Sequence, residues 1–153
     1  MTERKIVDAE GCTMGRLAAY AAKEALKGNR IIIINAEKAV ISGRKDHIFR
    51  DYKKRYDAKS KTNPKRYGPK RPKNPDRFLR RVIRGMLPWD KPGGRKAFRH
   101  VLVYMGRPEK EIIRREGIEL SKMQLVDNSE LKRHYDYFIT LGELCAYLGG
   151  RNE

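Results

Sequence analysis

Apolar residues recur along this chain at two spacings, one typical of a helix and one typical of a buried strand. Within Met14–Ala25 they lie at positions i, i+3, i+4, i+7, i+8 and i+11, which predicts a helix that ends at Gly28 and buries mostly alanine. Four consecutive isoleucines in Arg30–Asn35 predict a strand buried on both faces, and Lys5–Asp8 predicts a shorter strand before the helix. Strand, helix and strand in this order form a βαβ unit, so the pattern indicates an α/β fold with parallel strands.

A second amphipathic helix is predicted near the middle of the chain. Asn74 can cap it, Pro75 suits its first turn, and Gly85 and Pro88 end it. Its apolar stripe consists of Phe78, Leu79, Val82, Ile83 and Met86. The Gly- and Pro-rich stretch Lys91–Arg99 is expected to follow as a loop.

The remaining stretches predict short elements around these two helices. We expect an extended piece at 39–42, a basic helix over 44–56, a second buried strand over 100–104, an exposed helix over 109–116 and a last short helix after the capping box Thr140–Glu143. The chain of 153 residues fits a single domain over 1–153.

Positive charge is concentrated in the middle of the chain. The formal net charge is +17, and the segment Arg44–Arg99 holds 21 Lys or Arg residues against 5 Asp or Glu residues. The rest of the chain holds 15 basic and 14 acidic residues, which nearly cancel. This partition predicts a near-neutral scaffold that carries a surface for a polyanion, with nucleic acid favoured over an anionic membrane.

The segment Lys53–Asn74 has little to bury. Ten of its 22 residues are basic and one is acidic, so we expect it to be disordered alone and to become ordered on a polyanion. Three prolines favour an extended path, and Tyr56 and Tyr67 are candidates for stacking on unpaired bases, worth about 1–3 kcal/mol per base. The alternative is a flexible loop that only improves solubility.

Several other functions have weak support in the sequence. Cys12 and Cys145 have no C-x-x-C spacing and are expected to be free thiols in a reducing compartment. The three histidines are scattered, so no metal site and no cofactor are predicted. Neither a signal peptide nor an apolar run long enough to span a membrane is visible, which favours a cytoplasmic location. The turn Gly11–Gly15 between strand and helix is only weak support for a nucleotide site, because it lacks the G-x-G-x-x-G pattern. A tight turn and close helix packing are the favoured explanation of these glycines.

Four stretches together carry a resemblance to a known family. They are DAEGCTMGRLA (8–18), IINAEKAVISGRK (33–45), VIRGMLP (82–88) and LVYMGRP (102–108). Their sequence and order resemble the universal L13 family of large-subunit ribosomal proteins, in its archaeal form. The chain differs from the bacterial form in the basic segment 53–74 and in the tail after residue 108.

The resemblance implies a fold and a function. The implied fold is a three-layer α/β/α core on a small, mainly parallel sheet of about four strands, with 53–74 as a basic extended insert. The implied function is that of a structural constituent of the large ribosomal subunit, which binds and bridges large-subunit rRNA during early assembly beside neighbouring ribosomal proteins. No catalysis, small-molecule substrate or membrane is implied, and the location is the cytoplasm, within the large subunit.

Two sources supply the candidate RNA-binding residues. The resemblance implies contacts at Arg44, Lys45, Arg81, Arg84, Lys91, Arg95, Lys96 and Arg99. The charge pattern adds Lys53, Lys54, Arg55, Lys65, Arg66, Tyr67, Lys70, Arg71, Lys73, Arg77 and Arg80. Two competing hypotheses remain: an RNA-modifying or nucleotide-binding enzyme with its site at Gly11–Gly15, and a regulator that binds membrane surfaces or other polyanions.

Overall fold

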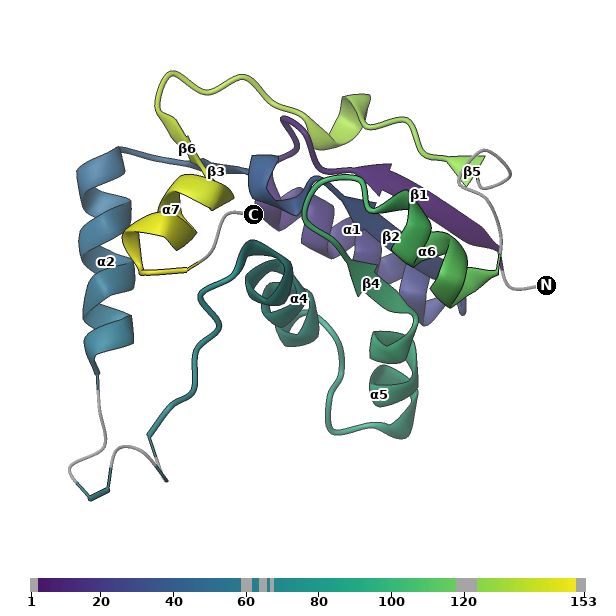
Figure 1. Cartoon of the computed structure of the whole chain (residues 1–153), viewed down its shortest axis with the longest axis horizontal. Helices are drawn as coiled ribbons and strands as arrows, with labels where there is room; N and C mark the ends of the chain where they lie inside the picture. Colours follow the sequence, from purple (N-terminus) through teal and green to yellow (C-terminus); the bar gives the residue numbers. More distant parts are fainter. Residues whose placement is uncertain (1–2, 59–61, 64–65, 67, 118–123, 151–153) are drawn as a thin grey trace.

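A computed structural model of the chain describes residues 3–58, 62–63, 66, 68–117 and 124–150. The elements in chain order are β1 (Arg4–Asp8), α1 (Met14–Leu26), β2 (Arg30–Ile34), η1 (Ala36–Lys38), β3 (Val40–Ser42), α2 (Lys45–Asp57), α4 (Pro75–Gly85), α5 (Pro92–Arg99), β4 (Val101–Val103), α6 (Glu109–Glu116), β5 (Gln124–Leu125), η3 (Ser129–Leu131), β6 (Phe138–Thr140) and α7 (Leu141–Tyr147). Figure 1 shows their arrangement.

A four-stranded parallel sheet forms the centre of the fold. Its strand order is β4-β2-β1-β5, and each adjacent pair of strands is parallel. In register, Ile6 of β1 lies beside Ile32 of β2, and Ile32 lies beside Leu102 of β4. The predicted βαβ unit is therefore confirmed as β1-α1-β2.

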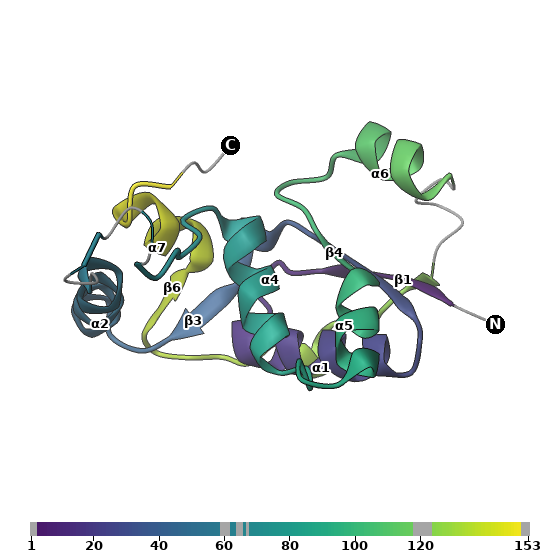
Figure 2. The same ribbon diagram turned by 90° about the horizontal axis from the view of Figure 1, so that it is seen from below.

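Helices cover both faces of this sheet, which gives three layers. On one face, Val7, Ile31 and Val101 join a core with Leu17 of α1 and Leu79 of α4. The residues that alternate with them point to the opposite face, where they form a smaller core: Ile6, Ile32, Ile34, Leu102, Tyr104 and Ile112 of α6. Figure 2 shows α1, α4 and α5 on one side of the sheet and α6 on the other. The predicted α/β/α arrangement is confirmed.

The alanine-rich face of α1 explains how closely the first helical layer packs. Ala18, Ala21, Ala22 and Ala25 are all buried, and α1 contacts both α4 and α5. Small side chains allow the axes of neighbouring helices to approach, so α4 and α5 both pack closely against α1 over one face of a narrow sheet.

A second, smaller unit lies beside the main sheet. β3 and β6 pair antiparallel, and α7 follows β6 directly, with the Thr140 hydroxyl accepting a hydrogen bond from the Glu143 N–H at 3.2 Å. α2 stands at the outer edge next to α7 (Figure 1), where the rings of Phe49 and Tyr147 stack with centroids 4.2 Å apart. Ile48 is the buried residue of α2, so most of this helix faces solvent.

The structure corrects three local expectations. Residues Lys91–Arg99 do not form a loop, because Pro92–Arg99 is helix α5 with Pro92 in its first turn. Met86 lies past the end of α4 and is 43% exposed, so it does not extend the apolar stripe. The first five residues of the expected extended insert, 53–57, are the last turns of α2.

Candidate nucleic-acid interface

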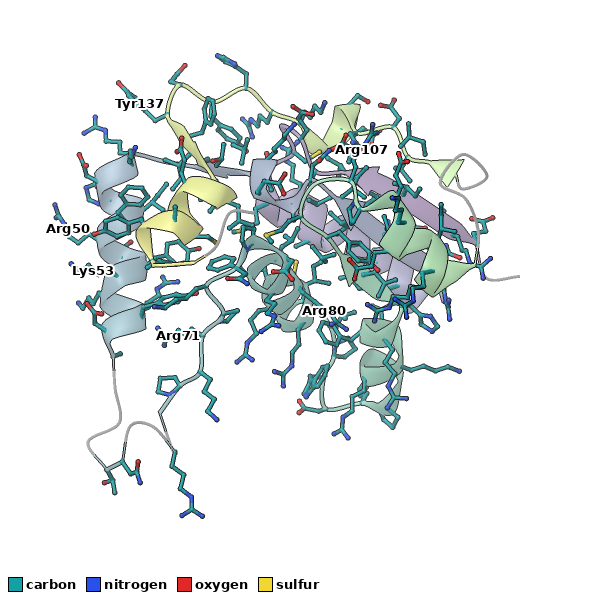
Figure 3. All side chains as sticks on the ribbon, in the orientation of Figure 1. Arg50, Lys53, Arg71, Arg80, Arg107 and Tyr137 are labelled. Carbon is teal, nitrogen blue, oxygen red and sulfur yellow. The ribbon has the colours of Figure 1, made fainter. Side chains whose placement is uncertain are left out.

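A groove lined by basic side chains lies between residues 70–74, α4 and the turn into α5. Its volume is about 630 Å³. The lining residues are Lys70, Arg71, Pro72, Lys73, Asn74, Arg77, Arg80, Arg81, Arg84, Trp89 and Phe98. Seven of these residues are basic and none is acidic among the described residues that line it, so its potential is positive throughout. In Figure 3, Arg80 projects from α4, whereas Arg71 extends from the 70–74 segment toward α2.

The amphipathic pattern of α4 places its arginines in this groove. Phe78, Leu79 and Ile83 are buried against the core. Because a helix repeats every 3.6 residues, the arginines three or four positions apart then fall on the other side, along the groove. Arg77 and Arg81 are exposed, whereas Arg80 and Arg84 are half-buried.

Two aromatic rings hold the half-buried arginines in place. The guanidinium carbon of Arg84 lies 4.0 Å from the centroid of the Trp89 ring, and that of Arg80 lies 4.6 Å from the Phe98 ring. The two rings meet edge to face with centroids 5.4 Å apart. A guanidinium stacked on a ring keeps its in-plane N–H donors available, so both side chains can still bind phosphate or a base edge.

The surroundings of Arg80 change the pKa of its guanidinium. Burial lowers the pKa of Arg80, the nearby Arg115 lowers it further, and Asp76 opposes the change. Arginine nevertheless remains charged at any physiological pH. A cation held under these conditions is stabilised when an anion or another hydrogen-bond acceptor binds.

Residues 71–72 are fixed to α2 through a tyrosine. The Tyr56 hydroxyl donates a hydrogen bond to the Pro72 carbonyl oxygen, and the Arg71 guanidinium lies 5.9 Å from the Tyr56 ring. Burial is the main cause that raises the pKa of Tyr56 to about 12, so the hydroxyl remains a donor. Tyr56, a candidate for stacking on a base, is half-buried against the core and lies beside Arg71.

The N-terminal end of α2 forms a separate aromatic and basic cluster. The Arg44 guanidinium lies 5.7 Å from the ring of Tyr137, which is 63% exposed. The Lys45 ammonium lies 5.4 Å from the Phe49 ring. These two predicted residues therefore lie at the opposite end of α2 from the groove, beside β6.

The other predicted residues are distributed over neighbouring surfaces. The groove collects Lys70, Arg71, Lys73, Arg77, Arg80, Arg81 and Arg84. Arg55 lines a hollow between α2 and α4. Lys53 and Lys54 line a second hollow on α2 with Arg50, Asp46, Asp57 and Tyr147 of α7. Lys91, Arg95, Lys96, Arg99 and Arg66 are exposed. Lys65 and Tyr67 lie outside the described residues.

Sequence reasoning missed three residues of this surface. Trp89 and Phe98 carry no charge and are nine positions apart, so nothing in the sequence associates them with Arg84 and Arg80. Arg50 was detectable, because it precedes Lys53 and Lys54 at helical spacing on α2.

The structure argues against a nucleotide site at Gly11–Gly15. The backbone N–H of Cys12 donates to the Ala9 carbonyl oxygen at 3.0 Å, and that of Thr13 donates to the Leu131 carbonyl oxygen at 3.0 Å. The Gly11 N–H is directed to the Lys38 carbonyl oxygen at 3.4 Å. A phosphate loop needs such N–H groups free to bind the ligand, whereas here they hold the turn itself.

The two cysteines are not reactive sites, and the described residues offer neither a metal site nor a membrane-spanning helix. Cys12 and Cys145 are buried and unpaired, and burial raises their pKa values to about 11 and about 12, so neither is an activated nucleophile. Within the ranges that the structure describes, no group of three His, Cys, Asp or Glu residues is placed to hold a metal ion. The same residues include no helix long and apolar enough to cross a membrane.

The comparisons with known proteins all identify the same family. Residues 3–110 match the family described as ribosomal protein L13. A Methanocaldococcus jannaschii protein named "Large ribosomal subunit protein uL13" is 42% identical over 146 residues, which cover 95% of this chain and 98% of that protein. Proteins of the same name from Haloarcula marismortui (42% over 144 residues, 94% of this chain and 90% of that protein) and Methanosphaera stadtmanae (46% over 119 residues, 78% and 83%) are similar.

Proposed function

This chain belongs to the ribosomal protein L13 family, in its archaeal type, and from that premise we propose that it binds and bridges rRNA within the large ribosomal subunit during early assembly. The family is a structural, non-enzymatic component of the ribosome. Its relatives are named for the large subunit. We propose that this chain is located in the same subunit and contacts neighbouring proteins there.

The groove beside α4 is the observation that supports RNA binding. Seven basic side chains converge on it without a lining carboxylate among the described residues. Arg84 and Arg80 are already ordered on Trp89 and Phe98, so binding costs them less side-chain entropy than it costs a free arginine. Phosphates that enter the groove would displace condensed counterions from the RNA, which favours association.

Two separate surfaces with basic side chains support the bridging part of the proposal. The groove lies along α4, whereas Arg50, Lys53 and Lys54 lie on α2 together with the carboxylates Asp46 and Asp57. Guanidinium groups on each surface can bind phosphates from different RNA helices. The rigid three-layer core would then fix the distance between those helices. Specificity is expected from RNA shape and unpaired bases, because the major groove of A-form RNA is too narrow for side chains to read.

The experiment that tests this function is sedimentation of a lysate from the native host through a sucrose gradient. The protein should co-migrate with the large subunit in high-magnesium buffer and again after low magnesium separates the subunits. Protein that remains at the top of both gradients would contradict the proposal.

A further inference from the structure

A second cavity adjoins the basic groove and is enclosed by α4, the end of β4 and α6. Its volume is about 340 Å³. Arg77 and Arg80 line both spaces, so the cavity and the groove are neighbours separated by these two side chains. Figure 3 shows the origin of Arg80 on α4. Neither the family assignment nor the proposed binding of RNA in the groove gives this cavity a function.

Three of the residues that line this cavity each carry a buried side-chain polar atom without a hydrogen-bond partner. These atoms are Oδ1 of Asp76, Nε of Arg80 and the hydroxyl oxygen of Tyr104. Across the described part of the chain only one other buried side-chain atom, on Asn128, is in the same condition. Tyr104 is only 7% exposed. Buried polar groups are nearly always hydrogen-bonded, and leaving one without a partner is costly. Because all three belong to residues that line one cavity, they point to a polar ligand there.

The backbone on both sides of Tyr104 fixes the position of its hydroxyl. The Tyr104 N–H donates to the Ile33 carbonyl oxygen at 2.8 Å, and its carbonyl oxygen accepts from the Ala36 N–H at 3.1 Å. Its side chain belongs to the core cluster with Leu102 and Ile112. Because backbone and ring are both fixed, the hydroxyl cannot move out to bulk solvent, and a hydrogen-bond partner has to enter the cavity.

The three groups define the chemistry of that ligand. The Asp76 carboxylate only accepts hydrogen bonds, the Arg80 guanidinium only donates, and the Tyr104 hydroxyl does either. A phosphate offers only acceptors and so cannot satisfy the Asp76 oxygen, although the lining holds three arginines (Arg77, Arg80 and Arg115) against the two carboxylates of Asp76 and Glu111. A metal cation would be repelled by Arg80 and Arg115. The pattern therefore requires a neutral group with donors and acceptors side by side.

A nucleobase edge meets this requirement, and the rest of the cavity suits its ring. Leu102, Met105 and Pro108 supply apolar contacts, and the volume far exceeds the roughly 30 Å³ that one water occupies in the liquid. Among the RNA bases, guanine presents two adjacent donors, N1–H and N2–H, beside the O6 acceptor. The donors match a carboxylate, and O6 matches a guanidinium N–H.

We propose that this cavity receives one unpaired guanine base of the RNA whose backbone lies in the adjacent groove. Asp76 accepts from N1–H and N2–H, Arg80 donates to O6, and the Tyr104 hydroxyl completes the recognition of the base. This inference rests on the proposed RNA-binding function and adds a base-specific site to it. It gives the protein sequence selectivity at one position, which phosphate contacts alone do not supply.

The first test is a titration of the full-length protein with free nucleosides, followed by ¹H–¹⁵N NMR. Guanosine should shift the amide resonances of residues 76–80 and 104–108 in a saturable manner. Inosine lacks the 2-amino group and should bind about 3- to 10-fold more weakly, the range expected for one lost hydrogen bond. No response to guanosine would mean that water fills the cavity, and equal responses to guanosine, inosine and adenosine would overturn the assignment to guanine.

The second test uses RNA. Tyr104→Phe removes the hydroxyl and keeps the ring, so affinity for a large-subunit rRNA fragment should fall by about 3- to 10-fold with an unchanged salt dependence. Tyr20→Phe on α1 is the matched control and should have no effect. If wild-type protein binds the fragment and Tyr104→Phe binds equally well, the guanine site is wrong while the proposed function stands. If wild-type protein does not bind rRNA at all, the proposed function itself fails.

Discussion

Arg84 and Arg80 differ from the other basic residues of the groove because an aromatic ring supports each guanidinium. The distances to the Trp89 and Phe98 rings are 4.0 and 4.6 Å. Arg95 contributes to the same arrangement, because its Nε–H donates to the Trp89 carbonyl oxygen at 3.0 Å. A lysine carries the same charge but has neither the planar fork nor the stacking surface. At these positions, side-chain shape should therefore matter as well as charge.

Arg84→Lys should lower affinity for large-subunit rRNA by about 3- to 10-fold, because about 1 kcal/mol of stacking and bidentate binding is lost. The slope of log affinity against log salt should remain the same, since the charge is retained. Arg81→Lys is the control at an exposed site and should change affinity much less. Filter binding at several salt concentrations measures both quantities. Equal losses for the two variants would show that the Trp89 stack contributes nothing to binding.

Glu24 on α1 is a buried carboxylate that stabilises the scaffold. It accepts hydrogen bonds from the ammonium groups of Lys5 at 2.7 Å and Lys27 at 2.6 Å and from the Asn29 amide at 3.0 Å. These hydrogen bonds lower the pKa of Glu24 from 4.5 to about 2. The bond from Lys27 is the largest cause, and the bond from Lys5 is the second largest. Because the folded-state pKa is depressed, this stabilisation is present above about pH 4.5 and is lost as the pH falls toward about 2.

Glu24→Gln should lower the free energy of unfolding at pH 7 by about 2–3 kcal/mol, since it leaves Lys5 without its buried partner. The difference between wild type and variant should shrink as the pH falls from about 4.5 to about 2. Urea unfolding followed by circular dichroism across this pH range gives the comparison. A difference that stayed constant with pH would contradict the role assigned to the Glu24 charge.

At the scale of elements, the turn between α4 and α5 decides the shape of the groove. A Cβ atom placed on Gly94 would lie 2.0 Å from the Pro88 carbonyl oxygen, so only glycine allows α5 to fold back this closely. Gly93, the preceding residue, has nothing within 4 Å of its would-be Cβ. The close approach at Gly94 keeps Phe98 of α5 within reach of Arg80 on α4.

Gly94→Ala should therefore displace α5 and destabilise the fold by about 1–3 kcal/mol, as overpacking typically does. It should also weaken rRNA binding, because the Trp89–Phe98 pair would move. Gly93→Ala should be neutral or slightly stabilising, by up to about 1 kcal/mol, through a lower entropy of the unfolded chain. Thermal unfolding of the two variants tests this pair directly. Similar melting temperatures would show that the turn is less tightly packed than the structure indicates.

The whole molecule combines a near-neutral core with a strongly basic surface. The charged segment 44–99 includes α2, α4 and α5, while β1, β2 and α1 lie outside it. The core keeps those three helices in fixed positions, and the net charge of +17 should speed the proposed association with RNA. Binding to RNA at this scale is expected to depend on counterion release.

For 6–10 phosphate contacts, affinity for rRNA should fall by roughly 10³–10⁵ between 50 and 200 mM salt. Replacing Lys53 and Lys54 by Gln should reduce the slope by about 1 per contact removed. Replacing Glu109 and Glu130 by Gln is a control at exposed carboxylates that line neither the groove nor the cavity, where no phosphate contact is expected to be lost. Fluorescence anisotropy with a labelled rRNA fragment gives the slopes. A flat salt response would exclude phosphate contacts as the main source of affinity.

Local patterns were sufficient to predict most elements of this fold. The helix Met14–Leu26, the isoleucine strand and the helix Pro75–Gly85 each have a clear period and clear end signals within their own residues. The prediction failed for α5, because Pro92, Gly93 and Gly94 favour a loop when their neighbours are unknown. In the folded chain the same proline suits a first helical turn, and Gly94 meets a steric requirement set by Pro88.

The amino-acid sequence by itself determined the α/β class, the family and the concentration of positive charge on one part of the chain. These properties depend on residue type and on short-range spacing, which the sequence displays directly. Only the tertiary structure decided which basic residues share one groove, which aromatic rings order them, and that Tyr56 positions Arg71 through Pro72. It also decided that Asp76, Arg80 and Tyr104 line one cavity. Such contacts join separate elements, and their distances are set by how β4, α4, α5 and α6 pack on the sheet.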